Sequence, residues 1–228
     1  MNDVQRVRAA LAADTVTDPG IPVDRVVEAL EELRPEVLAR FGELGFDETV
    51  AQETLADVAR KVEFYGTAEA AGPDVGIGAG WLLRLARADV VALGRLQFER
   101  VPRPDGRAVH VPEAGPLDPA AVDDSLARAV EVFGEGEFTC TTWLLDPLLP
   151  PALGEGSRIT GFARRFEVGA VERGDHGDRA AAKFVFRRTV AEVLDPVAVH
   201  PRTRLERCVA EHLRAGGHWS EPRGALRR

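Results

Sequence analysis

The sequence predicts an α+β protein, in which a helical N-terminal region is followed by a mixed or antiparallel sheet with helices. Up to residue 65, apolar side chains recur at helical spacing, whereas from residue 91 onward short alternating segments dominate. The stretch 66–80 between these regions is rich in glycine and alanine, which is typical of a linker. We therefore expect two domains, a helical domain over residues 1–80 and an α+β domain over residues 81–228.

The composition is that of an ordinary globular protein. Of the 228 residues, 45% are hydrophobic and 29% are charged, and the formal net charge is −8 at pH 7. An acidic chain is a poor partner for the phosphates of nucleic acids and for anionic membranes. No apolar run approaches the roughly 20 residues that span a bilayer, and the cysteines Cys140 and Cys208 imply no disulfide framework. We therefore expect a cytoplasmic protein, with no nucleic acid and no membrane as partner.

Capping and first-turn residues predict the N-terminal helices. Asp24 is expected to cap a helix that runs to Leu33, Pro35 to start the next helix, and Asp47 to begin a third. A further helix is expected over residues 81–90, where leucines recur at helical spacing. The chain is therefore expected to be mainly helical up to residue 90.

The C-terminal half is expected to combine strands with two helices. One helix is predicted over residues 118–133, with Asp118 as its cap, and the other over residues 203–214, ended by two glycines. The expected strands cover residues 91–101, 108–111, 137–145, 158–168 and 182–189, the last two around a polar turn at 172–179. This order suits a sheet covered by helices.

Three polar residues share one face of the strand expected at 91–101. Arg95, Gln97 and Glu99 alternate with apolar residues, so their side chains would line the open side of a half-buried strand. Such a row suits a binding or catalytic site, although solvated strand faces of this kind are common. Arg95 is a candidate ligand for an anion, and Glu99 is a candidate base.

A second candidate site lies where a strand ends at His110 and a loop with Glu113 begins. A histidine at a strand end beside a loop carboxylate can act as a general base with an orienting group, in either order. The alternative is structural, with His110 ending the strand and Glu113 solvated. Cys140 lacks a neighbouring base, so we expect a buried, inert thiol there.

Four further residues are candidates for substrate binding. Trp143 would wall a pocket or belong to the core, and Asp146 would cap a helix or take a polar role in the site. Arg164 and Arg165 lie on opposite faces of the strand expected at 158–168. A guanidinium there either forms a structural ion pair or binds a substrate carboxylate, phosphate or sulfate.

The other histidines are weaker candidates. His176 falls in a charged turn, and His200 and His218 fall in loops. The sequence contains no His-x-x-x-His or Cys-x-x-Cys pair, so no metal site is expected.

Several long stretches of the chain carry a resemblance to known proteins, in the same order along the sequence. They read Gly-Arg-Leu-Gln-Phe-Glu at 94–99, His-Val-Pro-Glu-Ala-Gly-Pro-Leu at 110–117 and Thr-Trp-Leu-Leu-Asp-Pro at 142–147, and continue at 157–166 and 212–219. These stretches resemble a family of bacterial acyltransferase-domain proteins, which have a small helical N-terminal domain and a C-terminal domain with the fold of GCN5-related N-acetyltransferases (GNAT). The resemblance covers about residues 50 to 219 and identifies the fold better than the reaction.

The resemblance implies an N-acyltransferase that moves an acyl group from acyl-CoA to a small-molecule amine. Proton removal would then pass through Glu99, Glu113 or His110. Two features depart from the family. No phosphate-binding signature Gln/Arg-x-x-Gly-x-Gly/Ala is expected between a strand and a helix of the C-terminal domain, and Thr141 stands where relatives often carry a histidine. The glycine-rich turn at 75–81 lacks a preceding strand, so it is a poor phosphate site.

These departures keep two other interpretations open. The first is a GNAT-like enzyme repurposed for natural-product biosynthesis, such as antibiotic biosynthesis, that promotes ring closure or elimination without acyl-CoA. The second is a non-catalytic, partner-binding protein, which a polar row at 95–99 that is ion-paired and closed to solvent would favour. The sequence also leaves open a homodimer or a required partner protein. Lysine occurs only at positions 61 and 183, and this strong preference for arginine is typical of an actinobacterial genome.

Overall fold

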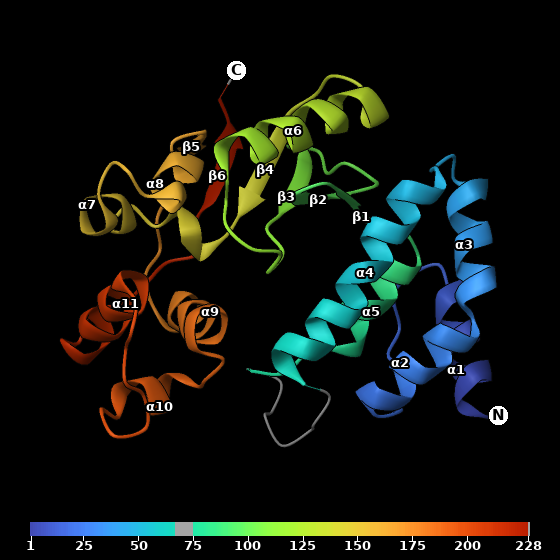
Figure 1. Ribbon diagram of the computed structural model, residues 1–228, viewed down its shortest axis with the longest axis horizontal. Helices are drawn as coiled ribbons and strands as arrows, with labels where there is room; N and C mark the ends of the chain where they lie inside the picture. The colour runs from blue at the N-terminus through green and yellow to red at the C-terminus, as the bar shows by residue number, and fades with distance from the viewer. Residues whose placement is uncertain (67–74, 228) are drawn as a thin grey trace. The chain divides into compact units, whose positions relative to one another are not determined.

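The computed structural model describes residues 1–66 and 75–227 (Figure 1). The chain forms two compact units. Unit 1 comprises residues 1–101, 111–114 and 125–133, and unit 2 comprises residues 102–110, 115–124 and 134–228. The linker expected at 66–80 lies mostly outside the described residues. The domain boundary at residue 80 stays a prediction.

Unit 1 consists mainly of helices, which run from blue through cyan to green in Figure 1. They are α1 (Asp3–Ala12), α2 (Val23–Glu32), α3 (Arg34–Glu43), α4 (Glu48–Tyr65) and α5 (Ala79–Ala86), followed by strands β1 (Val90–Leu93) and β2 (Leu96–Glu99). As predicted, Asp47 caps α4 by accepting the N–H of Val50 at 2.8 Å, and Pro35 lies in the first turn of α3. The prediction for Asp24 is wrong, because the N-cap of α2 is Pro22 and Asp24 lies in its first turn.

The strand expected at 91–101 is instead a hairpin of β1 and β2. The antiparallel register pairs Leu93 with Leu96, so Gly94 and Arg95 form a two-residue turn. Gly94 has a φ of +76°, which glycine adopts without strain. Arg95 therefore lies in the turn, and all residues of β2 are buried. The expectation of an open polar row is wrong.

Unit 2 combines short helices with four neighbouring strands of the sheet. Its elements are β3 (Arg107–His110), the start of α6 (Pro119–Phe133), β4 (Phe138–Thr141), α7 (Leu149–Leu153), α8 (Arg158–Ala163), β5 (Phe166–Val168), α9 (Asp175–Phe186), α10 (Val190–Leu194), α11 (Arg204–Arg214) and β6 (Arg223–Leu226). The strand order is β3-β4-β6-β5; β3 and β4 are parallel, and the other pairs are antiparallel. The predicted mixed α+β fold is confirmed.

The two helices predicted in this half of the chain are present. Asp118 caps α6, accepting the N–H of Ala120 at 3.2 Å. Thr203 and Glu206 form a capping box at the start of α11, and Gly216, with a φ of +79°, follows the end of that helix. Both helices therefore lie where the sequence predicted them.

Three expected strands are wrong or too long. Residues 158–168 form helix α8 before the short strand β5, and residues 182–189 contain the end of helix α9. Ala180, Ala181 and Ala182 are all buried on α9, and a run of small residues gives little helical periodicity to recognise. Strand β4 ends at Thr141, because the side chain of Thr142 accepts the N–H of Leu144 and starts a 3-10 helix.

The apolar core of unit 2 lies among α7, α9, α10 and α11. It contains two tryptophans, Trp143 and Trp219, which are 4% and 1% exposed, and the fully buried Val193. The structure therefore places Trp143 in the core. Among the described residues, no helix combines the length and apolar character of a membrane span.

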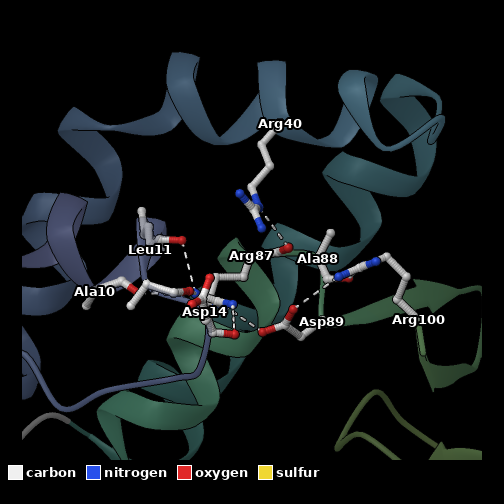
Figure 2. A network of polar contacts seen from close by, with 9 residues as sticks. Ala10, Leu11, Asp14, Arg40, Arg87, Ala88, Asp89 and Arg100 are labelled. Carbon is white, nitrogen blue, oxygen red and sulfur yellow. Dashed lines mark hydrogen bonds and ion pairs between the residues drawn. The ribbon is translucent and has the colours of Figure 1, made fainter. Parts of the chain in front are cut away.

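In unit 1, one buried arginine joins three helices to the hairpin (Figure 2). The guanidinium of Arg87 donates to the carbonyl oxygens of Ala10 at 3.2 Å and Leu11 at 3.1 Å, at the C-terminal end of α1. Its Nε donates to Asp89 at 2.7 Å, and its own carbonyl accepts from Arg40 of α3 at 3.1 Å. The charge therefore pairs with a carboxylate and satisfies helix-end carbonyls that would otherwise be buried without partners.

Replacing Arg87 is expected to destabilise unit 1 strongly. Arg87→Met should lower the free energy of unfolding by roughly 3 kcal/mol, because it strips a largely buried carboxylate and the end of α1 of their donor. Arg87→Lys should recover little of this, since one ammonium cannot reproduce the forked geometry of a guanidinium. Urea denaturation measures both changes, and a loss below about 0.5 kcal/mol for Arg87→Met would contradict the assignment.

Candidate functional site

Several chemically active residues of unit 2 gather at one edge of its sheet. The parallel strands β3 and β4 end there with His110 and Thr141. Strand β6 runs in the opposite direction, with Arg223 opposite Thr141, so the segment that carries Glu221 into β6 reaches the same edge. The carboxyl ends of parallel strands are a common place for ligands to bind. This edge is therefore the candidate functional site.

Glu221 meets His176 of α9 near this edge. The Nε2 atom of His176 lies 2.7 Å from Oε2 of Glu221. The imidazole side chain is 79% exposed, whereas the carboxylate side chain is only 18% exposed. Burial raises the pKa of Glu221, and the charge and hydrogen bond of His176 offset that rise only in part. The result is an accessible imidazole backed by a carboxyl group that is largely withdrawn from water.

This pair has the arrangement of a general base with its orienting group. When Nε2–H of His176 donates to Glu221, the other ring nitrogen, Nδ1, carries the lone pair and can accept a proton. The carboxylate fixes the tautomer and stabilises the imidazolium that forms, which is the logic of catalytic base pairs on unrelated folds. We call His176 and Glu221 the dyad.

The sequence alone does not reveal the dyad. The charged residues around His176 indicate a turn, whereas His176 lies in the first turn of α9, beside the acidic residues Asp175 and Asp178. Acidic residues in a first turn are a helix-start signal that could have placed His176 on a helix. Nothing in the sequence indicates its pairing with Glu221, which lies on a distant segment of the chain.

Glu113, the expected partner of His110, pairs with α4 instead. One of its carboxylate oxygens meets the ammonium of Lys61, and the other accepts from the hydroxyl of Tyr65. Burial raises the pKa of Glu113, but the charge of Lys61 and the two hydrogen bonds lower it further, so the net shift is downward. A carboxylate held in this way is a weak base. A catalytic role for Glu113 or His110 stays a prediction, and for Glu113 it requires the pair with Lys61 to open.

The polar row at 95–99 is closed by internal contacts. Arg95 donates to a main-chain carbonyl at 3.0 Å, and burial lowers the pKa of Arg95 although the charge of Glu113 opposes that shift. The buried Gln97 donates to Asp57 at 2.9 Å, and Glu99 accepts from Arg84 at 2.8 Å. Internal pairing of this face is what the partner-binding interpretation expects.

The two arginines of the expected strand at 158–168 lie between α8 and β5. The face assignment is therefore wrong, because residues 158–163 are helical. Arg164 forms an exposed ion pair with Glu155. Arg165 donates to Asp123 at 2.7 Å and to a main-chain carbonyl at the start of α6 at 3.1 Å. Both guanidinium groups thus have partners within unit 2, and a role in substrate binding stays a prediction.

Asp146 and Cys140 are buried beside the candidate site. Asp146 is fully buried and accepts the N–H of Leu148 at 2.8 Å, as a residue that begins a turn does. Burial raises the pKa of the Cys140 thiol to about 12, with a smaller contribution from Glu221, which agrees with the expected inert thiol. Among the described residues, no group of three or more histidine, cysteine or acidic side chains could hold a metal ion.

The mixed α+β fold is that of a GNAT-like domain, and comparison with known proteins agrees. Residues 90–226 match the family described as GNAT-like C-terminal domain, and the chain belongs to this family. This confirms the resemblance seen in the sequence. None of the curated proteins matches the chain.

Solved structures of acyltransferases are similar to the chain over almost its whole length. One is an acyltransferase in complex with decanoyl-CoA and teicoplanin, which is 29% identical with a TM-score of 0.79 over 98% of this chain and 75% of that chain. An acyltransferase mutant in complex with octanoyl-CoA gives the same values. An acyltransferase in complex with CoA and 10C-teicoplanin is 28% identical, with a TM-score of 0.79 over 99% of this chain and 75% of that chain.

Removing Glu113 is expected to destabilise unit 1 whatever its catalytic role. Glu113→Ala leaves the ammonium of Lys61, whose side chain is 11% exposed, without its carboxylate, and should lower the free energy of unfolding by about 3 kcal/mol. The double variant Lys61→Met/Glu113→Leu should recover most of that loss, because no charge is then left buried. Urea denaturation measures both.

A matched control for Glu113 is Glu155→Ala in unit 2. Glu155 also pairs with a cationic side chain, but its own side chain is 77% exposed, so its loss should change the free energy of unfolding by less than about 0.5 kcal/mol. Equal effects of the two variants would show that the pair of Glu113 with Lys61 is solvated in solution.

Proposed function

We propose that the chain is an N-acyltransferase that moves an acyl group from acyl-CoA to an amine of a small molecule of antibiotic biosynthesis. The observation that carries this proposal is the dyad, an exposed imidazole oriented by a largely buried carboxylate at the strand edge of a GNAT-like domain. The relatives bound to octanoyl-CoA and decanoyl-CoA support acyl-CoA as the donor.

In the proposed reaction, the acceptor amine attacks the carbonyl carbon of the thioester. A C–N bond forms, the C–S bond breaks, and the products are an amide and CoA. Nδ1 of His176 takes the proton that the amine loses, and this proton leaves with the thiolate of CoA. Glu221 stabilises the imidazolium in the interval. A positioned base of this kind contributes about 10²- to 10⁴-fold to the rate.

The names of the relatives suggest the first substrates to test. Octanoyl-CoA and decanoyl-CoA carry medium-length acyl chains, and teicoplanin is bound to one relative together with decanoyl-CoA. We therefore take decanoyl-CoA as the first donor and a teicoplanin-type glycopeptide amine as the first acceptor. The chain is 29% identical to this relative, so other amines should be screened with the same donor.

Decanoyl-CoA is expected to bind the purified protein with micromolar affinity. Isothermal titration calorimetry measures this directly, and decanoate alone should bind far more weakly because it lacks the nucleotide part of the donor. If neither decanoyl-CoA nor octanoyl-CoA binds at millimolar concentration, the result would favour the alternative interpretation, a repurposed GNAT-like enzyme that does not use acyl-CoA.

Loss of the base should slow acyl transfer without loss of donor binding. His176→Ala should lower kcat by about 10²- to 10⁴-fold in an assay of CoA release, while the Kd of decanoyl-CoA stays within about twofold. Glu221→Gln should cause a smaller loss, because the imidazole remains but its imidazolium is no longer stabilised by a charge.

The matched control for the base is His200→Ala. His200 is an exposed histidine in a loop of the same unit, so kcat should be unchanged in this variant. Full activity of His176→Ala, with either the tested or a newly found acceptor, would remove the dyad from the mechanism.

A further inference from the structure

The three residues before Glu221 are each held by hydrogen bonds to buried carboxylates of unit 2. His218, Trp219 and Ser220 lead into Glu221, and Trp219 belongs to the core of the unit. The contacts come from two sides, from the first turn of α9 and from the turn that follows β4. The position of the carboxylate of the dyad therefore depends on how this short segment is fixed.

From α9, the carboxylate of Asp178 contacts two of these residues. Its Oδ1 atom accepts the N–H of Trp219 at 2.7 Å, and its Oδ2 atom lies 2.6 Å from Nδ1 of His218. Asp178 is buried, and the hydrogen bond and charge of Asp178 raise the pKa of His218. Charge-assisted hydrogen bonds of this kind are about twice as strong as neutral ones.

The start of α9 also packs closely against the backbone of the segment 218–220. The N–H of Gly174 donates to the carbonyl of Trp219 at 3.1 Å. A Cβ atom on Gly177 would lie 2.2 Å from that carbonyl oxygen, so only glycine allows this approach. Asp178 and Gly177 directly follow His176, so the turn that carries the imidazole also fixes the segment that carries its partner.

From the other side, Asp146 holds the last residue before Glu221. Its Oδ2 atom accepts the N–H of Ser220 at 2.8 Å and the hydroxyl of Ser220 at 2.5 Å. Asp146 therefore fixes the segment at Ser220, while Asp178 ties its start to α9. The two carboxylates differ in one respect, because only Asp178 lies on the same helical turn as His176.

We propose that Asp178 is a positioning residue of the dyad, which fixes the distance between His176 and Glu221 by holding Trp219 against the first turn of α9. This inference rests on the proposed function for its meaning in catalysis. Asp178 contacts no reacting atom in this scheme; it acts through the backbone of Trp219. A displacement of about 1 Å in a catalytic group can cost about 10²-fold in rate, so its removal should affect kcat more than donor binding.

Asp178→Ala should lower kcat by about 10- to 100-fold, while the KM for decanoyl-CoA stays within about twofold of the wild-type value. Asp178→Asn should recover part of the loss in kcat, because an amide oxygen can still accept the N–H of Trp219. The matched control is Val193→Ala, a core substitution in the same unit, which should lower Tm without changing kcat.

A second readout needs no turnover. The proton between Nε2 of His176 and Glu221 should give a downfield imidazole N–H resonance in the proton NMR spectrum, identified by its loss in His176→Ala. It should persist in Val193→Ala and be lost or broadened in Asp178→Ala. If Asp178→Ala fails to fold, Asp178→Asn carries the test, and it must lower kcat and broaden this resonance more than Val193→Ala does.

Each outcome has a separate meaning for the two proposals. If Asp178→Asn and Asp178→Ala match Val193→Ala in both kcat and the resonance, the positioning role is wrong even though acyl transfer stands. If the wild type transfers no acyl group but the resonance is lost in the Asp178 variants, the positioning role stands and the proposed reaction is wrong.

Discussion

The hydrogen bond from the N–H of Trp219 to the carboxylate of Asp178 joins the two segments on which the candidate site depends. One segment is the first turn of α9, which carries His176, and the other leads into β6 and carries Glu221. Both segments contain buried residues, namely Asp178 in the first and Trp219 and Ser220 in the second. Their mutual contact, together with the indole of Trp219 in the core, fixes the two segments relative to each other.

The need to give every buried charge a partner constrains how the segments of both units pack together. In unit 2, Asp146 and Asp178 are buried, and each accepts a main-chain N–H. In unit 1, Glu113 pairs with Lys61 and Tyr65, and Arg87 donates hydrogen bonds to main-chain carbonyls at the end of α1. An unpartnered charge in these positions would cost several kcal/mol, so each pairing specifies which segments meet. The dyad differs because its imidazole is exposed and therefore available to a substrate.

The carboxylates of Glu113 and Glu221 lie in different surroundings, which suit them to different roles. Glu113 stands out in the sequence as a loop carboxylate, yet its contacts with Lys61 and Tyr65 favour the ionised form and weaken it as a base. Glu221 has the opposite environment, because burial raises its pKa and its partner is a histidine. Two carboxylates of similar exposure thus acquire different chemistry from their neighbours, as general principles of pKa control require.

The sequence by itself determined the α+β class, the helical start of the chain and the helices capped at Asp47 and Asp118, because capping chemistry is local. It misjudged 182–189, where helix α9 buries a run of alanines that shows no helical period. Only the tertiary structure decided that the strand expected at 91–101 folds back as a hairpin and that His176 meets Glu221. Such pairings join distant segments through packing, and no local pattern of residues records which segments will meet.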